Sequence, residues 1–199
     1  PHVPKQMIDR DQLIDEAYQI ASNDGISALS VRKVATACGI AVGSVYVYFP
    51  TKADLTAAVL TRFFDETFSD EFCAVRSGER FTSYVRRFRT TLSQARTAMS
   101  VDWFAEMRRL PRKEHVALEE VRGPMLTHME RGLQRVLDAD EAVDRSRLVG
   151  PMNSESVARL TLRAIFALLM EDAECETLFA LLDSALYDEL PANEKEESR

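Results

Sequence analysis

Residues 30–55 read SVRKVATACGIAVGSVYVYFPTKADL, and this stretch decides the fold. Ser30 is a good N-cap for the helical segment that follows it, and Gly39 suits the left-handed residue just past a helix end. Only Gly39, Ile40 and Ala41 separate this segment from the next helical stretch, VGSVYVYF. Two short helices joined by a tight glycine turn predict a helix-turn-helix.

A longer supporting helix is predicted just before this motif. Asp9 can cap it, and Gln12 can reach back to the cap as in a capping box. Ile8 and Leu13 then occupy the two positions of a hydrophobic staple. The run Asn23-Asp24-Gly25 predicts the end of the helix. The sequence therefore predicts a small three-helix head.

The third helix of this head is expected to have one buried face and one exposed face. At ~100° per residue, Val45 and Phe49 share the face that can dock on the other two helices. Gly43 and Val47 point the opposite way and form an outer ridge. The hydroxyl-bearing side chains on the two sides of this ridge are those of Ser44 and Tyr46.

Such a ridge suits the major groove of double-stranded DNA. This groove admits a helix whose flanks meet phosphates while its ridge meets base edges. Simple packing of a three-helix domain is the alternative explanation for the tyrosine cluster, and Phe49 is assigned to the core. Tyr46 does not face the core partners that packing would need. We therefore predict a phosphate contact for Tyr46.

The charge distribution points to the same end of the chain. The formal net charge is −7, yet residues 1–52 carry five basic and five acidic side chains. Residues 25–53 contain Arg32, Lys33 and Lys52 and no acid. A solvated helix start would also explain Arg32 and Lys33, but the acid-free neighbourhood favours DNA contact. Repulsion from the remaining acidic chain would discourage nonspecific DNA wrapping.

The rest of the chain predicts further helices and no strands. Glycine and proline are scarce, at seven each in 199 residues, which favours an all-α fold. Residues 139–153 are rich in turn formers and are expected to be mobile or a lid. The last two predicted helices are apolar enough to bury one side in their own core and the other against a second copy. The predicted helices are 52–72 with Thr51 as its cap, 79–97, 100–110, 114–138 with a kink at 122–124, 154–171 and 174–189.

Composition and motifs exclude several functional classes. The three cysteines lack CxxC spacing and predict reduced thiols of a cytoplasmic protein. The N-terminus has no secretory pattern, and the apolar run 164–170 is far shorter than the ~20 residues that span a bilayer, so we expect a soluble protein without membrane contact. No GxSxG, HExxH, GxGxxG or Walker pattern is present, so the sequence predicts no catalytic residue, no metal site and no cofactor.

The stretch 30–55, placed after an amphipathic helix that ends at Gly25, resembles the DNA-binding domain of the TetR family of bacterial transcriptional regulators. The resemblance covers residues 8 to about 60. It implies a helix-turn-helix DNA-binding domain at 1–52 and a larger ligand-binding and dimerisation domain at 53–190. The charged composition of residues 191–199 separately predicts a disordered tail. The resemblance also implies phosphate contacts and base contacts at matching positions. The phosphate positions are Ser30, Ser44, Tyr46, Tyr48 and Lys52, and the base positions are Arg32, Val42, Gly43 and Val47.

The sequence departs from the family pattern in two places. Ala41 stands where a serine or threonine often caps the recognition helix, which softens the helix start by ~1 kcal/mol. The ridge positions Val42, Gly43 and Val47 offer no side-chain hydrogen bond. Direct readout would then depend on Arg32, with Lys33 as a second candidate, and on thymine-methyl contacts and DNA shape. We expect a relaxed or AT-sensitive operator.

A set of aromatic and methionine residues could line an effector cavity between the C-terminal helices. Such residues at helical spacing are more often ordinary core, so both interpretations stay open. A histidine in this set could orient a ligand by hydrogen bonding. Seven arginines, at 86, 87, 89, 96, 108, 109 and 112, are either a solvated face or part of an anion-binding pocket. The cavity candidates are Phe88, Trp103, Phe104, Met107, Met125, His128, Met129, Phe166 and Met170.

Together these observations predict a ligand-responsive repressor that binds palindromic double-stranded operator DNA as a homodimer. Its partners would be the operator and a small-molecule effector of unknown identity. It would work in the bacterial cytoplasm, on the nucleoid when bound to DNA. An activator or a ligand-insensitive regulator fits the same residues. The rival from another class is an all-helical small-molecule carrier or enzyme with a vestigial helix-turn-helix head.

Overall fold

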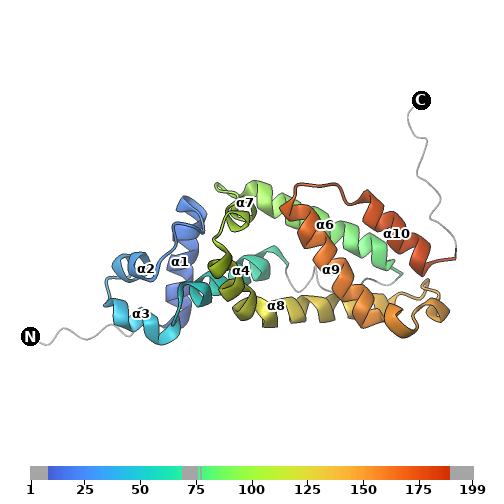
Figure 1. Ribbon diagram of the computed structural model, residues 1–199, viewed down its shortest axis with the longest axis horizontal. Coiled ribbons are helices and arrows are strands. Elements are labelled where there is room, and N and C mark those ends of the chain that lie inside the picture. The colour runs from blue at the N-terminus through green and yellow to red at the C-terminus, as the bar shows by residue number, and fades with distance from the viewer. Residues whose placement is uncertain (1–8, 69–75, 77, 189–199) are drawn as a thin grey trace, which may run out of the picture. The chain divides into compact units, whose positions relative to one another are not determined.

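The computed structural model describes residues 9–68, 76 and 78–188 of the chain. Every regular element in these ranges is a helix, which confirms the predicted all-α class (Figure 1). Ile8, Cys73 and the tail 191–199 lie outside the described residues. The α-helices are α1 (Arg10–Asp24), α2 (Val31–Ala37), α3 (Val42–Tyr48), α4 (Lys52–Thr67), α6 (Phe81–Ala98), α7 (Trp103–Arg108), α8 (Arg112–Ala139), α9 (Ser154–Met170) and α10 (Glu176–Leu186).

The chain forms two compact units. Unit 1 comprises Pro1–Phe72 and Leu92–Leu126, and unit 2 comprises Cys73–Thr91 and Thr127–Arg199. Unit 1 therefore holds α1 to α4, α7, the end of α6 and the first half of α8. The predicted division at residues 52 and 190 concerns roles rather than compactness, and it stays a prediction.

The first three helices form the predicted head of unit 1, in which α2 packs on both α1 and α3 (Figure 1). The α1 helix also packs on α4 of the same unit. The α1 start has the predicted capping box, because Gln12 N donates to Asp9 Oδ1 at 2.8 Å and Asp9 N donates to Gln12 Oε1. Leu13, Val34 and Val45 have no exposed surface and bring the three helices together. Burial of such apolar side chains is the main favourable term in the head.

The α4 helix begins at its predicted cap. Thr51 Oγ1 accepts from Asp54 N at 3.1 Å, and Thr51 N donates to the Asp54 carboxylate at 2.9 Å. This capping box satisfies amide groups that have no partner inside the helix. The helix ends at Thr67, and residues 69–72 of its predicted span lie outside the described residues.

The predicted helix 100–110 is too long at both ends. The observed α7 spans only Trp103–Arg108, because Asp102 acts as its N-cap and accepts from Ala105 N at 3.0 Å. Pro111 follows closely and starts the next turn. The α8 helix then runs as one element from Arg112 to Ala139 through Pro124. The predicted helices 52–72 and 174–189 also extend past the observed ends at Thr67 and Leu186, and the remaining helix ends lie within two residues of their predicted positions.

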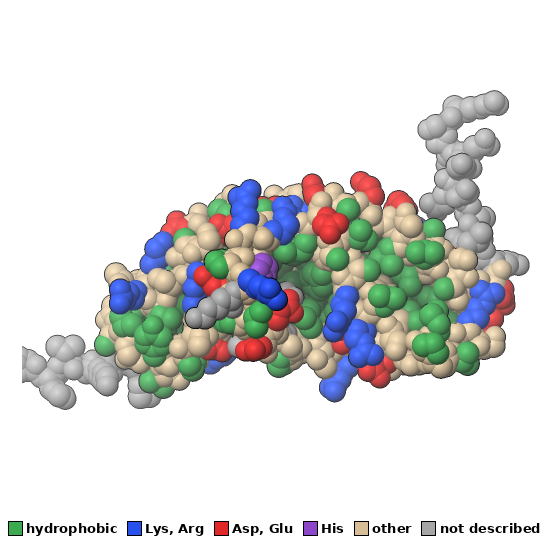
Figure 2. All heavy atoms as spheres, in the orientation of Figure 1, with side chains coloured by type: hydrophobic (Ala, Val, Ile, Leu, Met, Phe, Trp, Pro, Cys, Tyr) green, Lys and Arg blue, Asp and Glu red, His purple; other side chains and the backbone are tan. Residues whose placement is uncertain are grey.

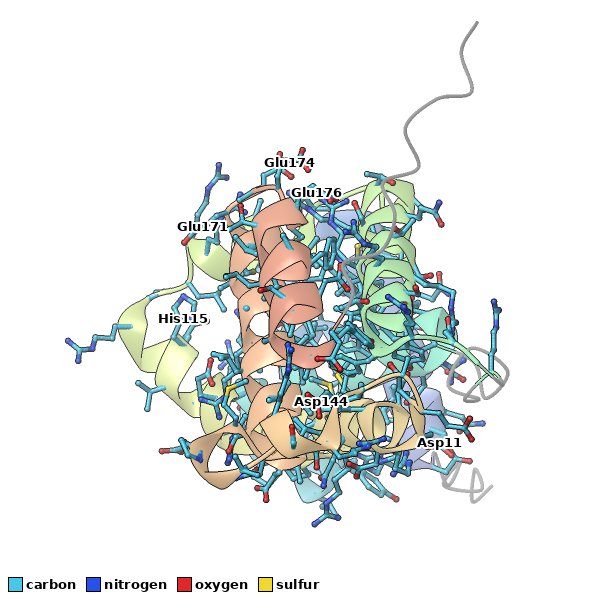
Figure 3. The ribbon with its side chains drawn as sticks, turned by 90° about the vertical axis from the view of Figure 1, so that its right-hand side faces the viewer. Asp11, His115, Asp144, Glu171, Glu174 and Glu176 are labelled. Carbon is cyan, nitrogen blue, oxygen red and sulfur yellow. The ribbon has the colours of Figure 1, made fainter. Side chains whose placement is uncertain are left out.

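The α8–α9 connection of unit 2, which the sequence predicts to be mobile or a lid, contains regular structure and hydrogen bonds, and a lid role stays a prediction. It contains two short 3-10 helices, η1 (Arg145–Arg147) and η2 (Gly150–Met152). Asp144 N donates to the Leu186 carbonyl at 2.9 Å, and the Arg147 guanidinium donates to the carbonyls of Ser184 and Tyr187. Figure 3 shows Asp144 near one end of α10 and Glu176 at the other. The connection is thus tied to the end of α10.

A buried carboxylate supports this arrangement. Asp140 is 5% exposed, and it accepts from Phe81 N at 2.7 Å and from the Tyr187 hydroxyl at 2.6 Å. Burial, followed by the hydrogen bond to Asp140, raises the pKa of Tyr187 well above its usual range. Asp140 therefore joins the start of α6 to the segment after α10. Among the described residues, no helix is long and apolar enough to cross a membrane.

Candidate nucleic-acid interface

The turn between α2 and α3 has the predicted tight geometry. Gly39 has φ of +65°, in the left-handed region that favours glycine. Ile40 N donates to the Ala35 carbonyl at 3.0 Å and closes the turn. Ser30 caps α2, since its Oγ accepts from Lys33 N at 3.2 Å. These contacts fix the direction in which α3 leaves α2.

The α3 helix presents the exposed face that its sequence predicts. Val45 and Phe49 are buried, at 0% and 1% exposure, whereas Tyr46 and Val47 are 50% and 77% exposed. Tyr48 is 40% exposed. Figure 2 shows apolar side chains on the surface over α3. This seven-residue helix leaves two aromatic rings and a valine largely exposed, which makes its outer face the candidate interaction surface.

The ridge of α3 is open on its outer side. A side-chain carbon added at Gly43 would meet no described atom within 4 Å. Val42 and Ser44, on the same turn, are half-buried. The expected lack of a side-chain cap is also observed, because Ala41 makes no capping bond and Ser44 N donates to the Ala41 carbonyl at 2.9 Å. The backbone of α3 can thus approach a partner closely at Gly43.

The basic side chains beside α3 are held differently from one another. Arg32 and Lys33 are both exposed, and Lys33 Nζ lies 3.5 Å from Asp24 Oδ2. Lys52 is half-buried, with Nζ 3.3 Å from the Ser27 carbonyl and 3.6 Å from Glu114 Oε2. Each of the two lysines in the acid-free run therefore has an acidic neighbour from outside it. Such exposed ion pairs contribute little free energy and leave the lysines able to change partner.

The loop between α1 and α2 is braced by α7, and no sequence pattern predicts this contact. Glu106 accepts from Ser27 N at 3.2 Å and from Ser27 Oγ at 2.7 Å. Trp103 Nε1 donates to the Ala21 carbonyl at 2.9 Å. Gly25 has φ of +92°, and a side-chain carbon there would lie 2.5 Å from the Glu106 carboxylate. Glycine at position 25 thus allows α7 to hold the loop that leads into α2.

The predicted effector residues are divided between the two units. In unit 1, Trp103 packs edge-on against Tyr18 and tilted against Phe63, and Phe104 also contacts Phe63. These rings, together with buried Met107, belong to the core beneath α1 and α4. Burial, with a hydrogen bond to Glu66, raises the pKa of Tyr18 to about 12.

The remaining candidates have mixed exposure. Phe88 of unit 2 is buried, and His128 is exposed. Three candidates in unit 2 and one in unit 1 are half-buried, namely Met129, Phe166, Met170 and Met125. A ligand role for the set stays a prediction. Within the described ranges, no group of three or more histidine, cysteine or acidic side chains could hold a metal ion.

Comparison with known proteins identifies the head. Residues 13–59 match the family model described as "Bacterial regulatory proteins, tetR family". The helix-turn-helix head of this chain belongs to the TetR family. The match covers α2, α3 and most of α1, and it ends within α4.

The TetR-family relatives share mainly this head. The HTH-type transcriptional repressor KstR of Mycolicibacterium smegmatis is 39% identical over 56 residues, which are 28% of this chain and 28% of that protein. These curated relatives are matched over 20% to 34% of their own length. The similarity to these relatives therefore covers one domain and not their full length.

Solved structures show that the fold extends beyond the head. BioQ with its double-stranded DNA operator has a TM-score of 0.59 and 15% identity, and the match covers 88% of this chain and 96% of that one. The multidrug binding protein EbrR complexed with imidazole has a TM-score of 0.56 and 20% identity, over 92% of this chain and 97% of that one. At these identities the likeness concerns the fold alone.

Proposed function

We propose that the chain is a TetR-family transcriptional repressor that binds palindromic operator DNA as a homodimer and is released by a small-molecule effector. The observation that carries this proposal is the outer face of α3, where Tyr46 and Val47 are exposed beside an open Gly43. A helix with such a face, held by a glycine turn on a capped α2, fits the major groove. In this role the chain is not an enzyme and needs no cofactor.

The contacts with DNA follow from the side chains on α3 and beside it. The Tyr46 and Ser44 hydroxyls lie on the flanks of the ridge, where phosphates would be within reach, and Tyr48, Ser30 and Lys52 are further phosphate contacts. Val42, Gly43 and Val47 would face base edges, with methyl groups suited to thymine. Arg32 is the donor that can read a guanine, with Lys33 beside it. The operator is therefore expected to be AT-rich at the base pairs that the ridge of α3 contacts.

The dimer would form through the last two helices of unit 2. Leu160 of α9 and Leu181 of α10 are 67% and 63% exposed, although the opposite faces of both helices are buried in the unit. Large exposed apolar side chains on two adjacent helices suit a helix-bundle seam with a second copy. A two-fold dimer would present two α3 helices to half-sites about one helical turn apart.

The effector would act by shifting the dimer between two arrangements of its heads. A ligand that favours the arrangement unable to span both half-sites weakens DNA binding, with a coupling of typically ~1–3 kcal/mol. The fold that the chain shares with a multidrug binding protein supports a ligand-responsive unit. The regulator would act in the bacterial cytoplasm, on the nucleoid when bound to DNA.

A selection experiment tests this function. The full chain is incubated with random-sequence duplexes, bound molecules are amplified, and the enriched sequence is measured by fluorescence anisotropy against a scrambled duplex. We expect an enriched palindrome that the chain binds at least about a thousandfold more tightly than the scrambled duplex. If no sequence is enriched and the chain instead binds small molecules without affecting DNA, the carrier or enzyme alternative is correct.

A further inference from the structure

A cleft of about 390 Å³ lies inside unit 1, between the start of α4 and the start of α8. Its volume is within the range of small-molecule sites. Ile26, Leu110 and Leu118 provide apolar walls, and the small side chains of Ala53 and Ala117 leave the space open. The cleft contains none of the residues that the sequence assigns to an effector cavity.

A lysine and a glutamate provide the charge at this cleft. Lys52 Nζ is held by the Ser27 carbonyl at 3.3 Å and by Glu114 Oε2 at 3.6 Å. An ammonium group has three donors, so Lys52 can bind a further acceptor. The two side chains are 38% and 45% exposed, and a pair this exposed is weak. A ligand can therefore replace Glu114 at little cost, because Glu114 can turn to water.

The charge of the ligand follows from how the two side chains are held. Lys52 has a second partner, the Ser27 carbonyl, that keeps its ammonium group at the cleft when Glu114 leaves. A cationic ligand would face this fixed ammonium group. The positive ends of two helices, α4 and α8, also lie at the cleft and favour an anion. The apolar walls require that the rest of the ligand be hydrocarbon.

We propose that this cleft binds a small amphipathic carboxylic acid, with its carboxylate on Lys52 and its hydrocarbon part between Ile26, Leu110 and Leu118. The proposed function gives this site a consequence, because Lys52 is also a predicted phosphate contact. An acid bound there occupies the ammonium group that DNA would use, so it weakens DNA binding directly. This second site acts without any contribution from the C-terminal effector cavity.

The experiment uses sodium octanoate as the probe and isothermal titration calorimetry of the full chain without DNA. Ala117→Phe fills the cleft and is expected to weaken octanoate binding by about tenfold or more. Glu114→Gln removes the competing carboxylate and is expected to strengthen it by about threefold. Loss of folding cannot produce such a gain. Glu120→Gln removes an exposed acid of α8 outside the cleft and is the matched control, with no change expected.

Three results would overturn the proposal: no octanoate binding, binding that Ala117→Phe leaves intact, or octylammonium binding at least as tightly as octanoate. Because binding is measured without DNA, a failure of the regulatory function appears separately, as a lack of affinity for any duplex. Octanoate titrated into a DNA complex then measures the consequence, and Ala117→Phe should make that complex insensitive to octanoate.

Discussion

At the scale of single residues, the exposed side chains of α2 and α3 have separable roles. Arg32 is fully available to a partner, since it makes no ion pair with any described residue, whereas Lys33 is paired with Asp24. Tyr46 offers a hydroxyl at the edge of the ridge, where phosphates rather than bases would lie. Sequence discrimination should therefore depend on Arg32 more than on Tyr46.

We predict that Arg32→Ala lowers the affinity for the selected operator. It should also reduce the difference in binding free energy between this operator and a scrambled duplex by about 1–3 kcal/mol. Tyr46→Phe should weaken binding to both duplexes by the same factor, because it removes only a phosphate hydrogen bond worth about 1 kcal/mol. Fluorescence anisotropy of the two variants on the two duplexes measures both effects. An Arg32→Ala variant with full operator preference would rule out its role in readout.

Asp102 caps α7 and forms an ion pair with Arg96. Hydrogen bonds from the Arg96 guanidinium, at 2.7 Å, hold the pKa of Asp102 below its ordinary value of 3.8. A lowered folded-state pKa stabilises the protein above pH 3.8, and this stabilisation is lost as the pH falls through the folded-state pKa. Asp102→Asn keeps a side-chain oxygen that can cap the helix, and it removes the charge.

Asp102→Asn should therefore lower the free energy of unfolding at pH 7 by less than about 1 kcal/mol, because the side chain is more than a third exposed. The difference from the unmodified chain should shrink below pH 3.8. Urea unfolding at pH 7 and pH 3 measures it. A difference that stays constant between the two pH values would show that the charge of Asp102 does not contribute.

At the scale of the elements, helix caps decide where the head begins and ends. Asp9, Ser30 and Thr51 each accept a hydrogen bond from the first turn of the following helix. Only α3 in the head lacks such a cap, at Ala41. Its position therefore depends on Val45 and Phe49 in the core and on the turn at Gly39.

We predict that Ala41→Ser stabilises the folded chain by about 1 kcal/mol, because the new hydroxyl can accept a bond from the first turn of α3. Ala37→Ser is the control, as an exposed change near the end of α2 where no cap is needed. It should be neutral or slightly destabilising. Urea unfolding measures both, and equal effects of the two variants would contradict the capping argument.

The elements of the head follow from the sequence, whereas several contacts of its side chains do not. The spacing of Val45 and Phe49 fixes which face of α3 is buried, and local rules predict the caps. Glu106 and Glu114 lie far along the chain from Ser27 and Lys52, which they contact. Long-range pairs of this kind have no local pattern. For the same reason the short α7 and the anchored α8–α9 connection could not be predicted, since Asp102 and Arg147 determine them through specific hydrogen bonds.

At the scale of the whole molecule, assembly is the property that the proposed function requires. A single α3 helix covers one half-site, so specific binding needs a second copy of the chain. Leu181 of α10 and Val149 of the α8–α9 connection have the same exposure, 63%, but only Leu181 lies on the proposed seam. These two residues form a matched pair for testing it.

Leu181→Glu should dissociate the dimer, because it places a charge in a buried apolar seam. Val149→Glu adds the same charge to an equally exposed position and should leave the dimer intact. Sedimentation velocity at several concentrations measures the mass of both variants. A dimer that survives Leu181→Glu would place the seam elsewhere, and a monomeric unmodified chain would contradict the proposed dimer.

The proposed function depends most on the claim that the open ridge of α3 enters the groove of double-stranded DNA. Gly43→Glu tests this claim directly, because the position is open and the new side chain meets no atom in the free protein. Gly132→Glu introduces the same charge on α8, where an added side-chain carbon has only ordinary contact with Arg135. With the selected operator and fluorescence anisotropy, Gly43→Glu should lose at least about a hundredfold in affinity through clash and repulsion, while Gly132→Glu keeps the affinity of the unmodified chain. Equal affinities for Gly43→Glu and Gly132→Glu, with both variants folded by circular dichroism, would contradict the account.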